Sequence, residues 1–200
     1  MLEKDSHKEK TIIVASGAWE HEISGGAYKV ATEFAEFLAA QGHAVFFVAA
    51  SKENIITNPT VHQNVEVWRY KAPAAKSPSL SNLFYHIKHS RKLVEEISEK
   101  RKIDYLNGHD YLQFLGAIKA LKKRGGVNTS FGVHSPLVLE NMAHWGVPFD
   151  CENTLSVWQL GLKRFAALHL FRLIEKRVYL ECDKIITDSQ FTLDEIAMRY

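Results

Sequence analysis

Three short polar segments of this chain contain residue types that could take part in chemistry, and each one follows an apolar run. They are Gly25-Gly26, His109-Asp110 and His134-Ser135. Adjacent glycines let a backbone pass close to a ligand, and the helix start that follows them offers free N–H groups to a phosphate. A histidine at the end of a strand can act as a base or bind a sugar hydroxyl. The sequence therefore predicts an anion site at the glycines and a cleft lined by histidine.

Each segment also has a structural explanation, which the sequence leaves open. The glycines can form an ordinary strand-to-helix turn, Asp110 can simply cap the helix that follows it, and His134 can be a structural histidine. The glycine loop has neither the GxGxxG fingerprint nor the GK[ST] of a P-loop, and no G-x-S-x-G occurs. These absences disfavour NAD chemistry, simple ATP hydrolysis and a serine hydrolase. His109 and His134 without a third ligand make a poor zinc set.

Apolar runs and helix-patterned runs alternate along the chain, which indicates the elements that position these segments. In the first helix we expect Val30, Phe34, Phe37 and Leu38 to form the buried stripe. We expect the third strand to be half-exposed and the segment after residue 136 to be irregular. The predicted strands are about 11–16, 44–50, 64–70, 103–107, 127–133 and 184–187, and the predicted helices about 27–41, 81–100, 110–124, 154–181 with a break near Gly161, and 191 onward.

This alternation predicts an α/β fold, a Rossmann-like and mostly parallel sheet with helices on both faces. In such sheets ligands bind beyond the carboxyl ends of the strands. The loops that follow the predicted strands are therefore the candidate site, and they include all three polar segments. We expect residues 1–10 to be a polar extension and residues 11–200 to form the domain.

Composition excludes several partner classes. The chain has 200 residues, 46% of them hydrophobic and 24% charged, with a net charge of +2, so charge gives no case for a nucleic-acid partner. Its two cysteines form no disulfide framework or metal motif. The N-terminus lacks the apolar core of a secretory signal, and no run approaches the roughly 18 apolar residues of a membrane span. We expect a cytoplasmic protein.

The long predicted helix holds a further candidate pair. Arg172 and Glu175 lie three residues apart on one face, where an intrahelical ion pair is the alternative to a role in the site. The segment 165–174 is apolar almost all round, which favours burial between layers. Because basic residues interleave with aromatics there, a membrane-surface role stays open.

The order of motifs resembles the N-terminal, acceptor-side domain of glycosyltransferase family 4, the retaining enzymes of GT-B fold. The resemblance rests on GGAYKV at 25–30, QGHAV at 41–45, Asp104 followed by His109-Asp110, FGVHSP at 131–136, and Glu175 followed by CDKIITDS at 182–189. Each motif alone is weak, but their order and spacing along nearly the whole chain make the resemblance specific.

The resemblance implies transfer of a sugar from a nucleotide-diphosphate sugar to an acceptor hydroxyl, with retention. Gly25 and Gly26 would contact the donor diphosphate, and His134 would touch the transferred sugar. Asp110 would orient or deprotonate the acceptor hydroxyl. The acceptor would be a sugar or a lipid-linked sugar. No metal or resident cofactor is implied, because the family meets the diphosphate with basic residues and helix ends. The remaining members of the substrate cleft would be His109, Ser135, Arg172 and Glu175.

The sequence departs from the family pattern in two respects. No two glutamates lie eight positions apart, as the donor-binding domain of the family requires. The chain also stops inside a helix pattern, so we expect it to be one half of a GT-B enzyme, inactive without its own C-terminal domain. Tyr28 stands where many members have glutamate.

Other functions stay open at this stage. A non-catalytic nucleotide- or sugar-binding module would share the fold. A GT-B nucleotide-sugar epimerase would use carboxylates such as Glu20 and Glu22 in the first loop. Lys88, His89, Arg91 and Lys92 in the helix 81–100 could face anionic lipid, which would make the protein peripheral at the inner membrane face.

Overall fold

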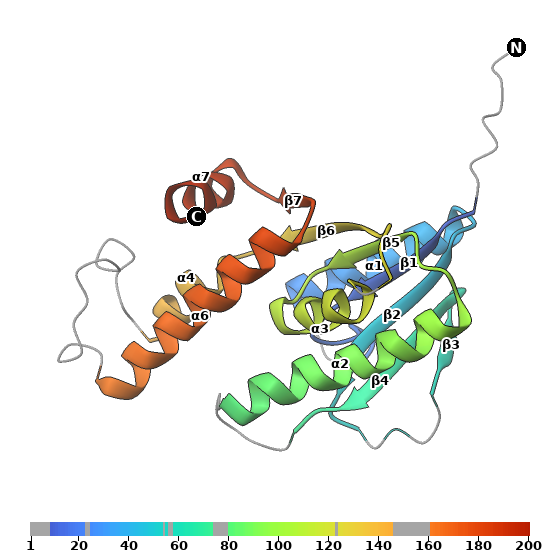
Figure 1. Cartoon of the computed structure of the whole chain (residues 1–200), viewed down its shortest axis with the longest axis horizontal. Helices are drawn as coiled ribbons and strands as arrows, with labels where there is room; N and C mark the ends of the chain where they lie inside the picture. The colour runs from blue at the N-terminus through green and yellow to red at the C-terminus, as the bar shows by residue number, and fades with distance from the viewer. Residues whose placement is uncertain are drawn as a thin grey trace, which may run out of the picture. The chain divides into compact units, whose positions relative to one another are not determined.

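The computed structural model describes residues 9–22, 25–53, 55, 58–73, 80–122, 124–145 and 161–200. The chain divides into two compact units, Met1–Ser130 and Phe131–Tyr200. Figure 1 shows the elements of both. Within the described residues, every helix is too short or too polar to span a bilayer.

The first unit is built on a mostly parallel sheet with the strand order β3-β4-β2-β1-β5-β6. β1 pairs in parallel with β2 and with β5, β2 pairs in parallel with β4, and only the short β3 is antiparallel to its neighbour among these pairings of described strands. The elements are β1 (Thr11–Ala15), α1 (Gly26–Ala40), β2 (Ala44–Ser51), β3 (Thr60–His62), β4 (Val65–Lys71), α2 (Leu80–Lys100), β5 (Tyr105–Gly108), α3 (Tyr111–Leu121) and β6 (Asn128–Val133), whose last three residues belong to the second unit.

The second unit continues from the end of β6, beside which β7 lies. Its helices α4 and α6 pack on each other, and α7 packs on β7. The elements are α4 (Leu137–His144), α6 (Leu162–Glu181), β7 (Lys184–Thr187) and α7 (Gln190–Arg199). The predicted α/β class is therefore confirmed. The predicted start of the long helix at 154 lies outside the described residues, and α6 begins directly after Gly161, whose φ is +74°.

In the first unit, helices cover both faces of the sheet, as expected. Alternate residues of a strand point to opposite faces, so the strands serve two cores. Ile12, Val14 and Phe47 pack with Ala31, Ala35 and Ala39 of α1. The other face is covered by α2 and α3, which contact β2, β4 and β1 (Figure 1).

The predicted buried stripe of α1 was wrong. Val30 is 45% exposed, Phe34 36% and Phe37 60%, whereas the alanine face of the same helix is buried. The alanines share the helical spacing of the larger residues, and small side chains let the helix lie close on β2 and β4. Of the predicted stripe, only Leu38 packs on the core.

Three further predictions need correction. The third strand is not half-exposed, because α2 covers its second face and leaves Trp68 only 5% exposed. Sequence analysis missed β3, which is only three residues long and joins β4 through a tight turn at Gln63-Asn64, both with positive φ. It also missed α4, in the segment expected to be irregular, since a helix of eight residues gives a weak periodic signal.

The contact between α2 and α3 depends on small residues where the helices cross. A Cβ at Gly116 would lie 2.5 Å from Ile87 O and 2.9 Å from Arg91 N, and it would also strike Ser90 Oγ. Ser90 is fully buried, and its hydroxyl donates to His86 O within its own helix. The backbones are therefore too close for any side chain larger than a hydrogen atom.

We expect Gly116→Ala to lower the free energy of unfolding by about 2 kcal/mol or more, because the added methyl group strikes backbone atoms that cannot move alone. Urea titration followed by circular dichroism measures the change. Gly26→Ala is the matched control, since a Cβ there meets nothing within 4 Å. Equal stability of the two variants would contradict the packing described for α2 and α3.

Candidate functional site

The carboxyl ends of β1 and β5 lie side by side, because Ala15 is in register with Gly108. The loop after β1 and the segment His109-Asp110 therefore meet. The contact is closest at Gly17, where a Cβ would lie 2.8 Å from Tyr28 Cε1 and 2.9 Å from Asp110 Oδ2. Gly17 thus lets the backbone pass between the first turn of α1 and the start of α3.

The glycine pair lies at the start of α1, as predicted. Gly25 is the N-cap residue in an extended conformation, so the N-cap position itself offers no side chain to the helix, and no acidic residue lies in the first turn. A Cβ at Gly25 would lie 3.0 Å from the ring of Tyr28, so the tyrosine packs against this backbone. Gly26 is exposed, and neither packing nor a positive φ requires a glycine there. The helix end consequently presents its positive potential at a surface with free space.

Asp110 caps α3, which confirms the structural explanation given above for this residue. Its Oδ1 accepts a hydrogen bond from Leu112 N at 2.9 Å. Its second oxygen, Oδ2, points toward Gly17. His109 is held by its backbone, whose N–H donates to Ala15 O at 2.8 Å, and its ring lies 6.0 Å from that of Phe34. Capping occupies one carboxylate oxygen and leaves the other directed at the loop after β1.

A hydrogen-bonded network of polar side chains lies near the Asp110 carboxylate. Gln113 Nε2 donates to Tyr70 Oη at 2.7 Å, and Tyr70 Oη also shares a hydrogen bond with His86 Nδ1 at 2.8 Å. Burial first, and then the negative charge of Asp110, raise the pKa of Tyr70 well above its usual value. Burial lowers the pKa of His86, with a smaller contribution from His89. Both groups are therefore neutral near pH 7.

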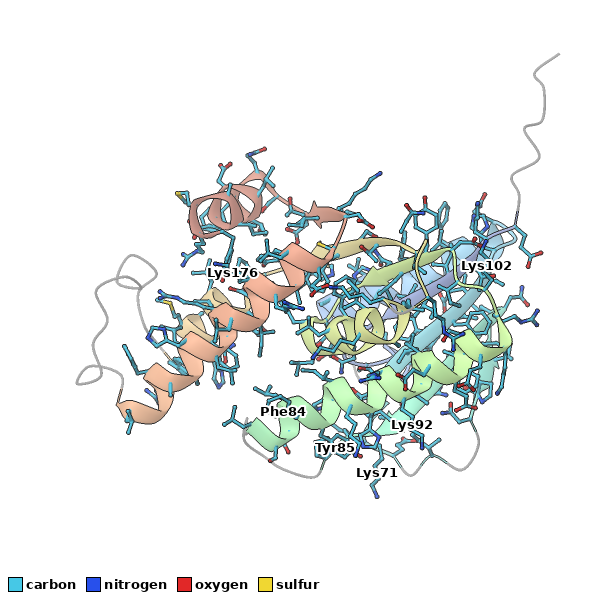
Figure 2. All side chains as sticks on the ribbon, in the orientation of Figure 1. Lys71, Phe84, Tyr85, Lys92, Lys102 and Lys176 are labelled. Atoms are coloured by element: carbon cyan, nitrogen blue, oxygen red, sulfur yellow. The ribbon has the colours of Figure 1, made fainter. Side chains whose placement is uncertain are left out.

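Tyr85 lies on the outer side of this hydrogen-bonded network. Its ring stacks on that of His89 at 4.0 Å, and its hydroxyl donates to Lys71 O at 2.9 Å (Figure 2). The stacked pair fixes the amino-terminal half of α2 over the end of β4. Sequence analysis missed Tyr70, His86 and Gln113, because no local motif marks residues that meet only through tertiary packing. It singled out Tyr28 only as a departure from the family pattern.

In the second unit, His134 directly follows β6, as predicted. It is half-buried, and burial lowers its pKa, with a partly opposing effect from the charge of Asp188. The imidazole is therefore neutral near pH 7. Ser135 Oγ lies 3.4 Å from Pro136 O, and Pro136 is the N-cap residue of α4.

Glu175 of α6 is fully buried, and both of its carboxylate oxygens are engaged. Oε1 accepts from Val138 N at 3.2 Å, and Oε2 accepts from the Tyr200 hydroxyl at 2.5 Å. The carboxylate therefore holds the first turn of α4 and, through it, the segment that contains His134. Burial and then Glu175 raise the pKa of Tyr200. Arg172 lies half-buried one turn earlier on α6.

The predicted site residues thus fall into two groups. The first group lies in the first unit, at the carboxyl ends of its strands, and comprises Gly25, Gly26, His109 and Asp110. The other group, in the second unit, comprises His134, Ser135, Arg172 and Glu175. That the two groups face one cleft stays a prediction.

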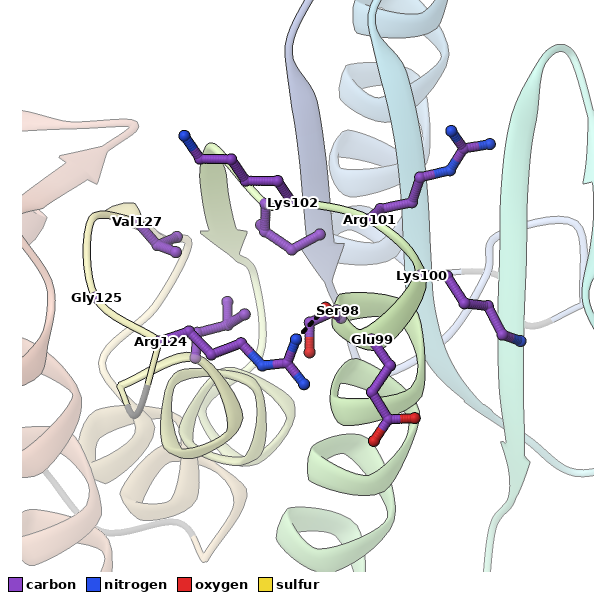
Figure 3. Close-up of a pocket in the computed structure, with 10 residues that line it drawn as sticks. Ser98, Glu99, Lys100, Arg101, Lys102, Arg124, Gly125 and Val127 are labelled. Carbon is purple, nitrogen blue, oxygen red and sulfur yellow. Dashed lines mark hydrogen bonds between the residues drawn. The ribbon is translucent and has the colours of Figure 1, made fainter.

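Two pockets of the first unit lie at the opposite end of the strands, near their amino ends. The larger, of about 350 Å³, is lined by basic side chains that include Lys100, Arg101, Lys102 and Arg124 (Figure 3). Arg124 donates to Ser98 O across it. The second, of about 340 Å³, lies beside Trp68, over whose ring Lys100 is placed at 5.2 Å. Neither pocket is lined by a predicted site residue.

Residues 24–200 match the family model described as Glycosyltransferase Family 4. This range includes all three polar segments and leaves out the loop before residue 24. The chain belongs to glycosyltransferase family 4. The resemblance of its motifs to this family is therefore confirmed. No curated protein sequence matches the chain.

Solved glycosyltransferase structures are similar to this family 4 chain. Sucrose-phosphate synthase from Thermosynechococcus elongatus aligns with a TM-score of 0.67 and 14% identity, over 96% of this chain and 45% of that one. An alpha-glucosyltransferase in complex with UDP and DNA gives 0.45 and 14%, over 90% and 38%. The calicheamicin glycosyltransferase CalG4 gives 0.44 and 12%, over 94% and 45%. The first of these likenesses confirms the Rossmann-like fold of one GT-B half, and the chain spans less than half the length of that structure.

Two variants of Asp110 separate its capping role from its charge. We expect Asp110→Ala to lower the free energy of unfolding by about 1 kcal/mol, because α3 loses its cap, and Asp110→Asn to be nearly neutral, because asparagine caps equally well. Urea unfolding of the two variants and the parent chain measures this. A loss in Asp110→Asn as large as in Asp110→Ala would show that the charge, rather than the cap, stabilises the fold.

The half-buried imidazole of His86 predicts a pH dependence of stability. Its folded pKa lies below the ordinary 6.5, so as pH falls below that value the unfolded chain binds more protons and stability decreases. We expect His86→Gln to show a smaller loss of stability between about pH 7 and pH 5 than the parent chain. Urea midpoints measured across this range test it, with the exposed His144→Gln as control. Equal slopes in all three proteins would contradict the assignment.

Proposed function

We propose that the chain forms the acceptor-side half of a retaining glycosyltransferase that moves a sugar from a nucleotide-diphosphate sugar to an acceptor hydroxyl. Family membership supports the reaction class. The observation that carries the proposal is the start of α1, where the N-cap residue Gly25 has no side chain to cap the helix and adjoins Gly26, a residue that the fold itself does not need to be glycine.

The helix start suits a diphosphate for electrostatic reasons. Backbone N–H groups of the first turn and the helix dipole together favour an anion, and they stabilise the extra negative charge that the leaving diphosphate gains. A Cβ at Gly26 would meet no atom of the described residues within 4 Å, which agrees with an open surface at this helix end. Basic residues of a second, donor-binding domain would complete the site in the full-length protein.

Asp110 is the proposed group for the acceptor. Its Oδ1 is fixed by the cap, so Oδ2 has a defined direction without any ligand. Such a carboxylate can orient an acceptor hydroxyl or accept its proton. His109, the next residue along the same edge, would bind a second hydroxyl of the acceptor.

His134 is the proposed contact to the transferred sugar. A neutral imidazole can accept or donate a hydrogen bond without adding charge, and burial keeps this ring neutral. Glu175 would then act as a positioning residue, since it holds the helix that follows the segment. Ser135 and Arg172 would line the same part of the cleft. The proposed transfer step uses no metal ion.

The reaction class is tested with the natural full-length protein. It should release nucleoside diphosphate from one of the UDP-, GDP- or ADP-sugars in an acceptor-dependent manner, with the anomeric configuration retained in the product. Binding of nucleotide sugars without turnover would instead support a binding module. Inversion of the sugar's own stereocentre without an acceptor would support an epimerase.

Substitutions at Gly26 test the diphosphate site, because charge should affect stability and activity in opposite directions. We expect Gly26→Glu to keep or increase the free energy of unfolding, since a carboxylate at a helix start is favourable by about 0.5 kcal/mol. The same carboxylate should repel the donor and lower kcat/KM by at least about ten-fold.

Gly26→Gln, of the same size but neutral, is the matched control and should lose less activity than Gly26→Glu. Asp110→Asn, which keeps the cap, should lower kcat with little effect on the KM of the donor. Equal kcat/KM for Gly26→Glu and Gly26→Gln would show that the diphosphate does not bind at this helix end.

A further inference from the structure

A histidine–carboxylate cluster in the first unit consists of residues that the proposed transfer does not use. Glu36 Oε1 of α1 lies 3.2 Å from His21 Nε2 and 3.3 Å from His62 Nδ1. The three donor atoms all lie within 4.8 Å of one another. The residues come from the loop after β1, from α1 and from β3, which no sequence motif connects.

We propose that His21, Glu36 and His62 bind a divalent transition-metal ion of the zinc class. Two imidazoles and one carboxylate are a donor set that zinc takes, usually with a water molecule in the fourth position. In a tetrahedral site with metal–ligand bonds of about 2.1 Å, neighbouring donor atoms lie about 3.4 Å apart. The separations of 3.2 and 3.3 Å from the carboxylate oxygen agree with that spacing.

His62 Nδ1 lies beside Glu36 Oε1 without forming a hydrogen bond to it, which favours a shared ion over a simple pairing. This nitrogen is buried from solvent and has no hydrogen-bond partner among the described residues. A buried acceptor or donor without a partner is unfavourable. An ion between the three donor atoms would satisfy this nitrogen.

The cluster is held in place by its surroundings. On one side of His21, Glu20 N donates to Thr32 Oγ1 at 3.2 Å, and on the other side Glu22 forms an ion pair with Arg69 of β4. The rings of His21 and His62 lie 5.3 and 5.8 Å from the buried ring of Trp19. The donors are therefore preorganised, so little ordering would oppose binding.

The cluster is also accessible. The side chains of His21 and His62 are 47% and 42% exposed, while Glu36 is 18% exposed. An ion can enter from solvent, and water can fill the remaining position. Binding would tie the loop that leads to Gly25 to both α1 and β3, a stabilising role that the proposed sugar transfer neither uses nor requires.

Isothermal titration of the untagged chain with zinc chloride tests the proposal, with magnesium chloride as the hard-ion control. We expect one saturable zinc site per chain, no magnesium binding, and a rise in melting temperature with zinc. Glu36→Gln and His62→Asn should each weaken zinc binding by at least about ten-fold.

Glu33→Gln is the matched control, because Glu33 lies on the same helix, is exposed, and pairs only with Lys29 among the ion pairs described. It should bind zinc as the parent chain does. Absence of zinc binding by the parent chain would overturn the proposal. Equal affinities of Glu36→Gln and Glu33→Gln would also overturn it, because the ion would then be bound elsewhere. Circular dichroism of each variant confirms that a loss of binding is not a loss of folding.

Discussion

The close approach at Gly17 is the constraint on which the candidate site depends. Here the chain leaves β1 with the ring of Tyr28 on one side and the carboxylate of Asp110 on the other, each too near for a side chain in between. Parallel pairing of β1 with β5 brings Asp110 to this place, and the turn through Gly25 brings Tyr28. The glycine thus fixes the distance between the start of α1, the proposed anion site, and a carboxylate.

The residues of this region combine structural and chemical roles. Asp110 caps α3 with one oxygen and directs the other toward Gly17, so the requirement of the helix also orients the group proposed for catalysis. Glu175 does something similar in the second unit, where it holds the first turn of α4. Such dual roles mean that loss of activity alone does not identify a catalytic group. Variants that keep the cap, such as asparagine at position 110, separate the two effects.

Sequence patterns predicted every described strand except the short β3, and most helices, because the alternating apolar and helix-patterned runs are clear. They also placed Asp110 correctly as a helix cap, since it accepts from Leu112 N. The prediction for α1 was wrong because the alanines and the larger apolar residues of that helix recur with the same spacing. Only packing against the sheet determines that the alanine face is the buried one. The network of Tyr70, His86 and Gln113, like the cluster at Glu36, joins residues from separate elements, and its members have no fixed spacing in sequence.

In the proposed function the start of α1, and not the basic pocket near the amino ends of the strands, receives the diphosphate. Backbone amide chemical shifts, followed by NMR while UDP is added to the chain, distinguish these two sites. We expect shifts at the N–H groups of Gly25, Gly26 and Ala27. Shifts at Lys100, Lys102 and Arg124, with those three amides unmoved, would contradict it.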